Sequence, residues 1–577
     1  MIIYTLKKLI EQISSKRKIQ FLFLLAFTVF SALLEMVSIY SIVPFIGLVT
    51  NEAYLVNIPY FTEFLEIDDR NKAVMIYGLI FGFLYIFNSI SRIFLIYCTA
   101  RLSRVATAEL SINMYEFKLF DSYSNYIIEK STNLISAITQ KSTQVGNVLG
   151  AIINLISGGI IFLCIIIILI AINPQVMTVS ILFFAVLYYL ISVLSKKKIN
   201  ESSKIVNLSQ NNVVKGLQDG IGAIRNIILD KSHNFYIKLF KKENFNLARQ
   251  SAFLQFIQQS PRYIFEALGI FLFVILLVYW NETKSKEEFL EIFPTLAALA
   301  IGAQRILPLL NNIYANLVLI KGSFHQVEQV TNILSNYSLS KKENIKIKKK
   351  DINFKNLISF KDVSFSYDKK SNILQDVSFE IKKGSKIGII GKTGEGKSTF
   401  LDLLMGLLEP QKGAIYIDSS KLSKETCDSW QSKVSHVPQR IFLSDDSFLG
   451  NIAFGIEKEK INKEKVELVS KKSQIHELII KSEGEYNKNV GEQGIGLSGG
   501  QIQRIGLARA LYKEAELIIL DEATNSLDSY TEKLIMEEIN NLSKDLTVVI
   551  VSHSMDTLKN CDVIFEVKNK KVIQIPK

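Results

Sequence analysis

The sequence predicts a multidomain protein, with an all-α domain of membrane-spanning helices followed by an α/β domain. Residues from about 19 to 313 contain several runs of about 20 residues with few charges, each long enough to cross a hydrocarbon core as a helix. Beyond about residue 340 no such run occurs, and short apolar strands alternate with helical patterns. At 577 residues the chain is also too long for one hydrophobic core.

Six spans are predicted in the first domain. Because six is an even number, both ends of the chain are expected on one side of the membrane. The predicted spans are Ile19–Leu48, Ala73–Tyr97, Leu149–Ile172, Val176–Leu194, Tyr263–Trp280 and Phe289–Ile313.

The distribution of Lys and Arg predicts cytoplasmic termini, because positively charged loops are retained in the cytoplasm. The stretch between spans four and five carries 11 Lys and Arg residues from Lys196 to Arg249, whereas the loop after span one is mainly acidic. The net charge of +12 is then explained by basic loops beside anionic lipid, so no nucleic-acid partner is expected.

Three segments are expected along the chain: a membrane domain over residues 1–338, a linker over 339–352 and a second domain over 353–577. The linker is rich in lysine and polar residues. In the membrane domain, two long cytoplasmic loops continue the helical pattern of the spans. Short transverse helices are predicted near Ser122–Glu129 and Leu217–Ile224, where a motor domain can push.

The second domain begins with strands that alternate like those of an antiparallel sheet, at Leu357–Tyr367 and Val377–Ile381. Continuous apolar runs at Lys386–Ile390, Leu517–Leu520 and Val548–Val551 then alternate with helices. This second pattern predicts a parallel sheet buried on both faces.

A glycine-rich turn follows the strand that ends at Ile390 and precedes an apolar helix over Thr399–Leu408. This is the setting of a phosphate-binding loop, as in the P-loop NTPases. Backbone amides cradle the β-phosphate, Lys397 reaches the β- and γ-phosphates, and Ser398 ligates Mg²⁺. The predicted ATP-binding residues of the loop are Gly391, Thr393, Gly394, Glu395, Gly396, Lys397, Ser398 and Thr399.

An acidic pair follows a second apolar strand, at Asp521 and Glu522. Asp521 is predicted to lie in the Mg²⁺ shell. Glu522, one residue farther on, is predicted to orient and polarise the attacking water as the catalytic base. ATP and Mg²⁺ are therefore the expected cofactors.

Further segments resemble the ATP-binding cassette (ABC) family, in the order that this family shows. Leu497–Gln501 is similar to the signature motif, which implies that Ser498, Gly499, Gly500 and Gln501 contact ATP bound by the opposite subunit. Gln439 resembles the Q-loop glutamine that senses metal and water, which implies a catalytic residue and a Mg²⁺ ligand. His553 resembles the switch histidine, which implies a second catalytic residue. Tyr367 resembles the aromatic residue that stacks on adenine, and Asp528 lies in the D-loop, which departs from the family pattern at Asn525 and Ser526.

Six spans ahead of the cassette resemble an exporter-type ABC transporter, and Val490–Gly494 is similar to the X-loop of that branch. The resemblance implies that Lys397 of one chain faces Ser498 of another across ATP. Because the residues for catalysis are intact in this chain, a homodimer is favoured. The alternatives are an exporter of another lipid or of a peptide and, from a different class, an ATP-gated channel or channel regulator.

Three arginines in the spans are candidate substrate contacts, because charges inside a membrane are costly. Arg92, Arg262 and Arg305 lie 16 to 19 residues from the outer ends of their spans. This places them roughly 24 to 28 Å below the outer surface. A ring of guanidinium groups suits a phosphate or pyrophosphate, but arginines at helix ends also anchor by reaching the interface, and Glu266 can neutralise Arg262.

The membrane half resembles bacterial flippases for lipid-linked oligosaccharides of protein N-glycosylation. Ser31–Thr50 is similar to their first span, and segments around Pro261–Tyr263 and Arg305–Pro308 to their cavity. The resemblance implies a lipid-linked saccharide cargo, a place in the bacterial cytoplasmic membrane, and cargo contacts at Arg262 and Arg305; in span two the matching position is Asn88. It also implies a short outer helix with an apolar face at Ile58, Phe61, Phe64 and Leu65.

Overall fold

The computed structural model describes residues 2–50, 70–128, 131–172, 174–283, 286–346, 349–367, 371–491, 494–523, 529–540, 545–553 and 555–576. The chain forms two compact units. The first comprises Met1–Asp121 and Glu129–Lys341, and the second comprises Ser122–Ile128 and Lys342–Lys577. The predicted apolar face at Ile58, Phe61, Phe64 and Leu65 lies outside the described residues.

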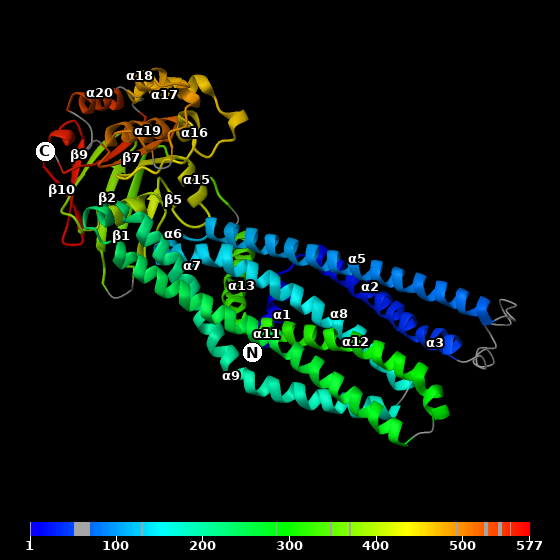
Figure 1. The fold of residues 1–577 in the computed structure, drawn as a ribbon. Coiled ribbons are helices and arrows are strands. Elements are labelled where there is room, and N and C mark those ends of the chain that lie inside the picture. The colour runs from blue at the N-terminus through cyan, green and yellow to red at the C-terminus, as the bar shows by residue number, and fades with distance from the viewer. Residues whose placement is uncertain are drawn as a thin grey trace. The chain divides into compact units, whose positions relative to one another are not determined.

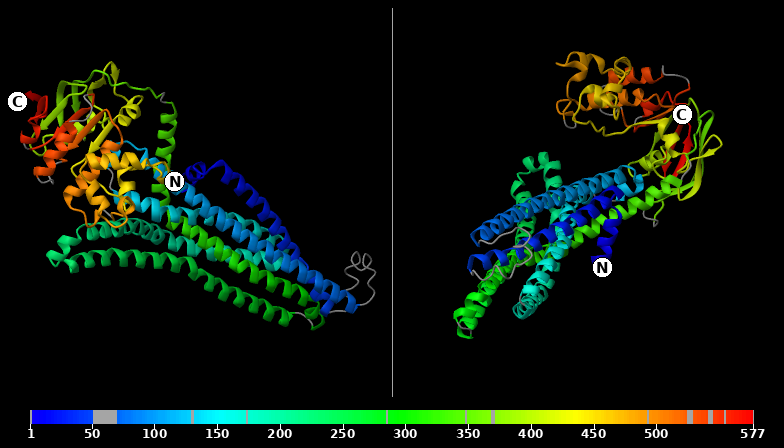
Figure 2. Two further views of the ribbon diagram at one scale, coloured as in Figure 1. Left: turned by 90° about the horizontal axis from the view of Figure 1, so that it is seen from above. Right: turned by 90° about the vertical axis from the view of Figure 1, so that its right-hand side faces the viewer.

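The first unit is helical. Its long helices lie lengthwise beside one another in both views of Figure 2, with α9 against α11, α8 against α12 and α2 against α5. The helices are α1 (Ile2–Glu11), α2 (Ser15–Tyr40), α3 (Ile42–Thr50), α5 (Arg70–Leu119), α7 (Ser131–Ser136), the π-helical turn η2 (Ala137–Lys141), α8 (Ser142–Ile172), α9 (Pro174–Gly222), α10 (Ile224–Leu229), α11 (His233–Thr283), α12 (Lys286–Gly322) and α13 (Phe324–Lys346).

Three stretches of the described residues are long and apolar enough to cross a membrane: Ser15–Val49, Asn71–Leu119 and Thr132–Ala171. They overlap the first three predicted spans. The other three predicted spans fall within helices α9, α11 and α12. Helices α5, α9 and α11 have 50, 49 and 51 residues. At a rise of about 1.5 Å per residue each is about 75 Å long, so it extends well beyond a hydrocarbon core of about 30 Å.

Short helices interrupt the two long loops. Helix α6 (Tyr123–Ile128) lies within the first predicted transverse segment and belongs to the second unit. The second transverse helix is α10, which begins at Ile224 and therefore lies later than the predicted Leu217–Ile224. The difference arises because α9 remains helical as far as Gly222, and the backbone leaves helical geometry only at Ala223 (φ −98°, ψ 17°).

The second unit contains two sheets (Figure 1). One has the order β2-β1-β4-β5 and the other β10-β9-β3-β8-β7-β6. The strands are β1 (Leu357–Phe365), β2 (Leu374–Lys382), β3 (Lys386–Ile390), β4 (Lys412–Ile417), β5 (Ser420–Lys421), β6 (Val434–Val437), β7 (Leu517–Asp521), β8 (Thr547–Val551), β9 (Val563–Lys568) and β10 (Lys571–Ile575).

Helices of the second unit connect these strands. They are α14 (Lys397–Leu404), α15 (Cys427–Ser432), α16 (Phe448–Ile452), α17 (Lys463–Lys472), α18 (His476–Ile480), α19 (Gly499–Tyr512), α20 (Ser529–Asn540) and α21 (Met555–Leu558), with 3₁₀ turns at Lys458–Lys460 and Glu485–Asn487. The predicted order of an all-α domain followed by an α/β domain is confirmed.

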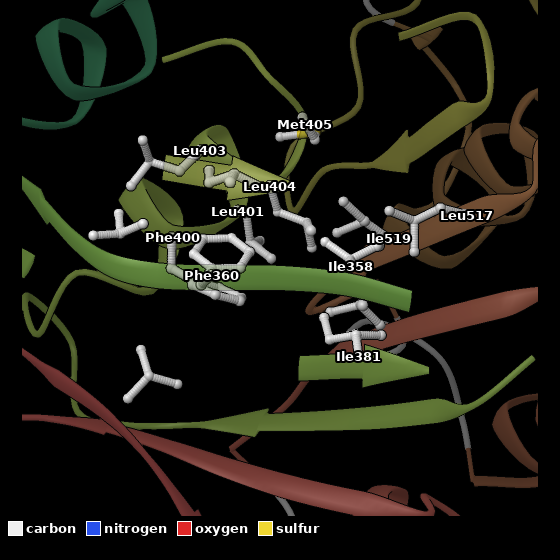
Figure 3. Packing of buried hydrophobic residues seen from close by; sticks show 14 of the residues in the cluster. Ile358, Phe360, Ile381, Phe400, Leu401, Leu403, Leu404, Met405, Leu517 and Ile519 are labelled. Carbon is white, nitrogen blue, oxygen red and sulfur yellow. The ribbon is translucent and has the colours of Figure 1, made fainter. Parts of the chain in front are cut away.

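Helix α14 is held in place by the main apolar core. Its side chains Phe400 and Leu404 are fully buried and lie beside Phe360 of β1 (Figure 3). Phe360 packs on Phe400 with ring centroids 5.5 Å apart. Burial of each such side chain contributes about 1.5 to 3 kcal/mol. The core therefore fixes the helix that directly follows the glycine-rich turn.

The parallel register brings the ends of four strands to one edge. β3 pairs with β8, β8 with β7, and β7 with β6, all in parallel. Asp521 lies opposite Val551, and Ile389 also lies opposite Val551. Since the residues that follow parallel strands meet at the same edge, this edge is where ligands bind in open α/β sheets.

One strand position in the antiparallel sheet requires glycine. Gly413 in β4 has φ +75°, and a Cβ there would come within 2.3 Å of the carbonyl oxygens of Lys361 and Asp362. A register shift in β1 after Lys361 accompanies this close approach.

We expect Gly413→Ala to lower the thermal unfolding temperature of the detergent-purified protein, because the added Cβ would collide with two carbonyl oxygens. Unfolding is measured by the fluorescence of the buried Trp430.

The matched control is Gly455→Ala. Gly455 has φ +78° but nothing within 4 Å of its Cβ position, so it incurs only the left-handed strain of about 1 to 2 kcal/mol. Equal unfolding temperatures for the two variants would contradict the close packing of β1 on β4.

Candidate functional site

The glycine-rich turn forms a tight loop between β3 and α14. Gly394 and Gly396 have φ of +88° and +100°, which side chains rarely adopt. Lys397 donates hydrogen bonds from Nζ to the carbonyls of Gly391 (2.6 Å) and Lys392 (3.2 Å). The ammonium group is thereby held against the loop, at the N-terminus of α14, where backbone amides and the helix dipole favour an anion.

The neighbouring predicted residues surround this loop. The carboxylate of Glu395 accepts a hydrogen bond from the backbone amide of Asn569 (2.9 Å). Tyr367 lies with its hydroxyl 3.3 Å from Thr399 Oγ1, which is buried. Thr393 and Ser398 are exposed at the surface of the loop. The structure therefore places Tyr367 next to the helix that the loop precedes.

Three predicted catalytic residues lie in direct contact. Gln439 donates from Nε2 to Glu522 Oε2 at 2.7 Å, and His553 Nε2 lies 3.0 Å from Glu522 Oε1. The Glu522 backbone has φ +51°, unusual for a residue with a side chain. Its carboxylate is thus held from both sides. Gln439, predicted also as a metal ligand, is bonded to Glu522.

Acidic groups cluster beside Lys397. Burial and the charge of Glu522 raise the pKa of Asp521, whereas the charge of Lys397 lowers it. Asp402, on α14 one turn after Ser398, has its pKa raised to about 6 by burial and by the charge of Asp521. Sequence reasoning missed Asp402; its signal is an acid four residues after Ser398.

These groups fit Mg²⁺ bound together with ATP. Within the described ranges, no group of three or more His, Cys, Asp or Glu side chains forms a metal site. Mg²⁺ is ordinarily held by one or two protein oxygens and the phosphates of a nucleotide. Asp521 and Ser398 would supply those protein oxygens, and the concentration of negative charge at Asp521 and Asp402 favours a divalent cation.

The signature segment forms the start of helix α19. Ser498 is the N-cap residue: its Oγ accepts from the backbone amide of Gln501 (3.3 Å), and Gln501 Oε1 accepts from the amide of Ser498 (2.9 Å). This capping box leaves Gly499 exposed. The helix N-terminus is therefore rigid, open and suited to a phosphate. Asp528, Asn525 and Ser526 lie outside the described residues.

Two of the three membrane arginines share one carboxylate. Glu35, from the first predicted span, is buried and forms an ion pair with Arg92; Arg305 Nη1 lies 3.8 Å from Glu35 Oε1. Arg305 also donates to the hydroxyl of Tyr85 and lies 4.9 Å from the centre of its ring. We call Glu35, Tyr85, Arg92 and Arg305 the charge cluster. One acid against two arginines leaves it one unit positive.

Arg262 is placed separately. Its Nε donates to Glu266 Oε1 at 2.7 Å, and its side chain is 54% exposed. Glu266 is the neutralising partner that its spacing from Arg262 predicts. Sequence reasoning did not assign Glu35, although a lone acid inside a predicted span is a recognisable signal. Asn88, one turn before Arg92, is buried.

Comparisons with known proteins match the second unit to ABC transporters. Residues 374–525 match the family model for "ABC transporter". The chain is 39% identical over 224 residues to the "Iron-sulfur clusters transporter atm1, mitochondrial" of Neurospora crassa, covering 38% of this chain and 31% of that protein. It is 34% identical over 220 residues to the "ATP-dependent lipid A-core flippase" of Saccharophagus degradans, covering 38% of this chain and 37% of the flippase.

The chain thus spans only about a third of the length of these curated relatives. A solved structure described as a bacterial Atm1-family ABC exporter with ATP bound superposes with a TM-score of 0.75, covering 96% of this chain and 94% of that one, at 18% identity. The match over residues 374–525 confirms the predicted ATP-binding cassette. The whole chain has the fold of an ABC exporter, a helical domain followed by an ABC domain.

Proposed function

We propose that this chain is an ATP-driven exporter or flippase that moves an amphipathic, lipid-linked saccharide from the cytoplasmic leaflet outward in the cytoplasmic membrane of a bacterium. The observation that supports ATP hydrolysis is the carboxylate of Glu522, which lies 2.7 Å from Gln439 Nε2 and 3.0 Å from His553 Nε2. A fixed carboxylate beside a phosphate-binding loop is arranged to orient water for hydrolysis. The same residues make the chain an ATPase.

Each part of the site has a distinct role in this proposal. Lys397 and the amides of the loop bind the phosphates. Ser398 and Asp521 would hold Mg²⁺, which would supply positive charge to neutralise the phosphates. Glu522 accepts a proton from the attacking water. Gln439 and His553 restrict the rotation of Glu522, so the base is oriented before the nucleotide arrives.

A complete site needs a second copy of the chain. The exposed, capped N-terminus of α19 offers amide donors to a phosphate. In the proposed homodimer, Ser498 of one copy and Lys397 of the other enclose one ATP. Closure of two such sites draws the ABC domains together, and this movement changes the conformation of the membrane domain.

The cargo is proposed from the membrane unit. The charge cluster carries one uncompensated positive charge, and guanidinium groups bind phosphate in bidentate geometry. A pyrophosphate-linked saccharide meets this requirement. The similar proteins named above carry different cargo names, a lipid and iron–sulfur clusters, so an exporter of another lipid or of a peptide is the alternative. An ATP-gated channel would differ from this exporter, because its cargo would move down a concentration gradient without ATP hydrolysis.

The first test replaces the proposed base. Glu522→Gln keeps an oxygen for Gln439 and the size of the side chain but cannot accept a proton. We expect steady-state ATP hydrolysis by the purified protein to fall at least about 100-fold, while ATP binding is retained. The control is Glu537→Gln, on an exposed face of α20, which is expected to hydrolyse ATP normally. Normal hydrolysis by Glu522→Gln would show that Glu522 is not the catalytic base.

The second test addresses the charge cluster. Arg305→Ala leaves the Glu35–Arg92 ion pair intact, so the fold is expected to persist. In vesicles, we expect ATP-driven movement of a pyrophosphate-linked saccharide lipid to fall about tenfold or more, with ATPase activity in detergent changed less than twofold. Arg101→Ala, exposed on α5, controls for loss of a basic residue. Unchanged movement would make Arg305 an anchor.

A further inference from the structure

A polar cavity of about 690 Å³ lies within the first unit. Its walls come from helices α8, α9, α11, α12 and α13. This volume falls in the range of about 300 to 1,000 Å³ that small-molecule sites occupy. The cavity differs from the charge cluster, because none of Glu35, Tyr85, Arg92 and Arg305 lines it.

Carboxamide side chains dominate the lining. Eight Asn or Gln residues contribute, among them Gln258 and Gln259 of α11 and Asn311 and Asn312 of α12. Arg262 is the single charged residue among the described residues that line it. Each carboxamide offers both donors and acceptors of hydrogen bonds without a charge. This lining suits a neutral ligand with many groups that both donate and accept hydrogen bonds.

Hydrogen bonds within the wall fix several of these groups. Gln326 and Gln210 are buried, and Gln326 donates from Nε2 to Gln210 Oε1 at 3.0 Å. Gln258 donates from Nε2 to the carbonyl of Ala315 at 3.3 Å. Asn311 Oδ1 is buried without a hydrogen-bond partner within the described part of the chain. Gln259 and Asn312, by contrast, are exposed in the lining, so their carboxamides are open to a ligand that donates and accepts hydrogen bonds.

We propose that this carboxamide cavity binds the neutral saccharide portion of the cargo; the inference rests on the proposed flippase function. Sugar hydroxyls donate and accept like carboxamides, and the exposed ring of Tyr263 offers a face for the apolar side of a sugar ring. Arg262 in the same wall is already paired with Glu266, so the linking phosphate is assigned to the charge cluster. No acid among the described lining residues is present to pair with the amino group of a peptide.

The test compares two lipids in vesicles containing the full chain. One is a short-chain polyprenyl pyrophosphate carrying a neutral trisaccharide of N-acetylhexosamine, and the other is the same lipid without sugar. In the double variant Gln259→Leu, Asn312→Leu we expect the half-saturating concentration of the saccharide lipid to rise about tenfold, because two hydrogen bonds are lost. The value for the sugarless lipid stays within twofold.

Two further variants serve as controls. Asn316→Leu removes a carboxamide one turn farther along α12 that does not line the cavity, and is expected to behave as wild type. Asn312→Gln, made as a single substitution, retains the carboxamide and is expected to bind the saccharide lipid as wild type does. Together they separate loss of hydrogen bonding from altered packing of α12.

Each result decides between distinct failures. If wild-type protein moves no saccharide lipid, the proposed function is wrong and this inference falls with it. If wild-type protein moves the saccharide lipid but the double variant keeps its half-saturating concentration, the cavity proposal alone is overturned. A neutral peptide is tested in parallel through its stimulation of ATP hydrolysis. If the double variant raises the half-saturating concentration of the peptide but not that of the saccharide lipid, the cavity binds a peptide and the saccharide proposal is overturned.

Discussion

The carboxylate of Glu522, held between Gln439 and His553, is the interaction on which the ABC domain depends. The three residues follow three adjacent parallel strands, β6, β7 and β8. Gln439 comes two residues after β6, Glu522 one residue after β7, and His553 two residues after β8. Any slip in the register of one strand would separate the side chains. The parallel register of the sheet therefore brings these three residues, and the phosphate loop after β3, to one edge.

Charge imposes a second constraint in the membrane unit. Arg92 and Arg305 come from helices that are far apart in the sequence, and the buried carboxylate of Glu35 joins them. An unpaired charge in a low-dielectric interior is costly, so loss of Glu35 would leave Arg92 and Arg305 without their shared counter-ion. The charge that remains makes the cluster receptive to an anion. The carboxamide cavity adds neutral hydrogen-bonding groups. In the proposed cargo, the charge cluster would meet the phosphate and the cavity would meet the sugar.

Much of the ABC domain follows from local sequence. The glycine-rich turn, the acidic pair after an apolar strand and the capped start of α19 are each encoded within about ten residues. Their convergence follows from the parallel sheet, which periodicity predicts. The partnership of Glu35 with two arginines was not predictable in this way, because pairing between distant helices has no local pattern. The same holds for the cavity, whose carboxamides are spread from Gln144 to Gln326. The start of α10 was misplaced because helical periodicity does not mark where the backbone turns.

The central claim is that two copies of this chain form one ATP-hydrolysing machine with shared sites. Mixing Lys397→Ala chains with Ser498→Arg chains tests it most directly, because each variant alone inactivates both sites of its homodimer. In the mixed dimer, one site combines an intact Lys397 with an intact Ser498. The account predicts that ATP hydrolysis, absent from each variant alone, returns on co-expression to a measurable fraction of the wild-type rate. Absence of hydrolysis from a mixed dimer verified by two affinity tags would contradict it.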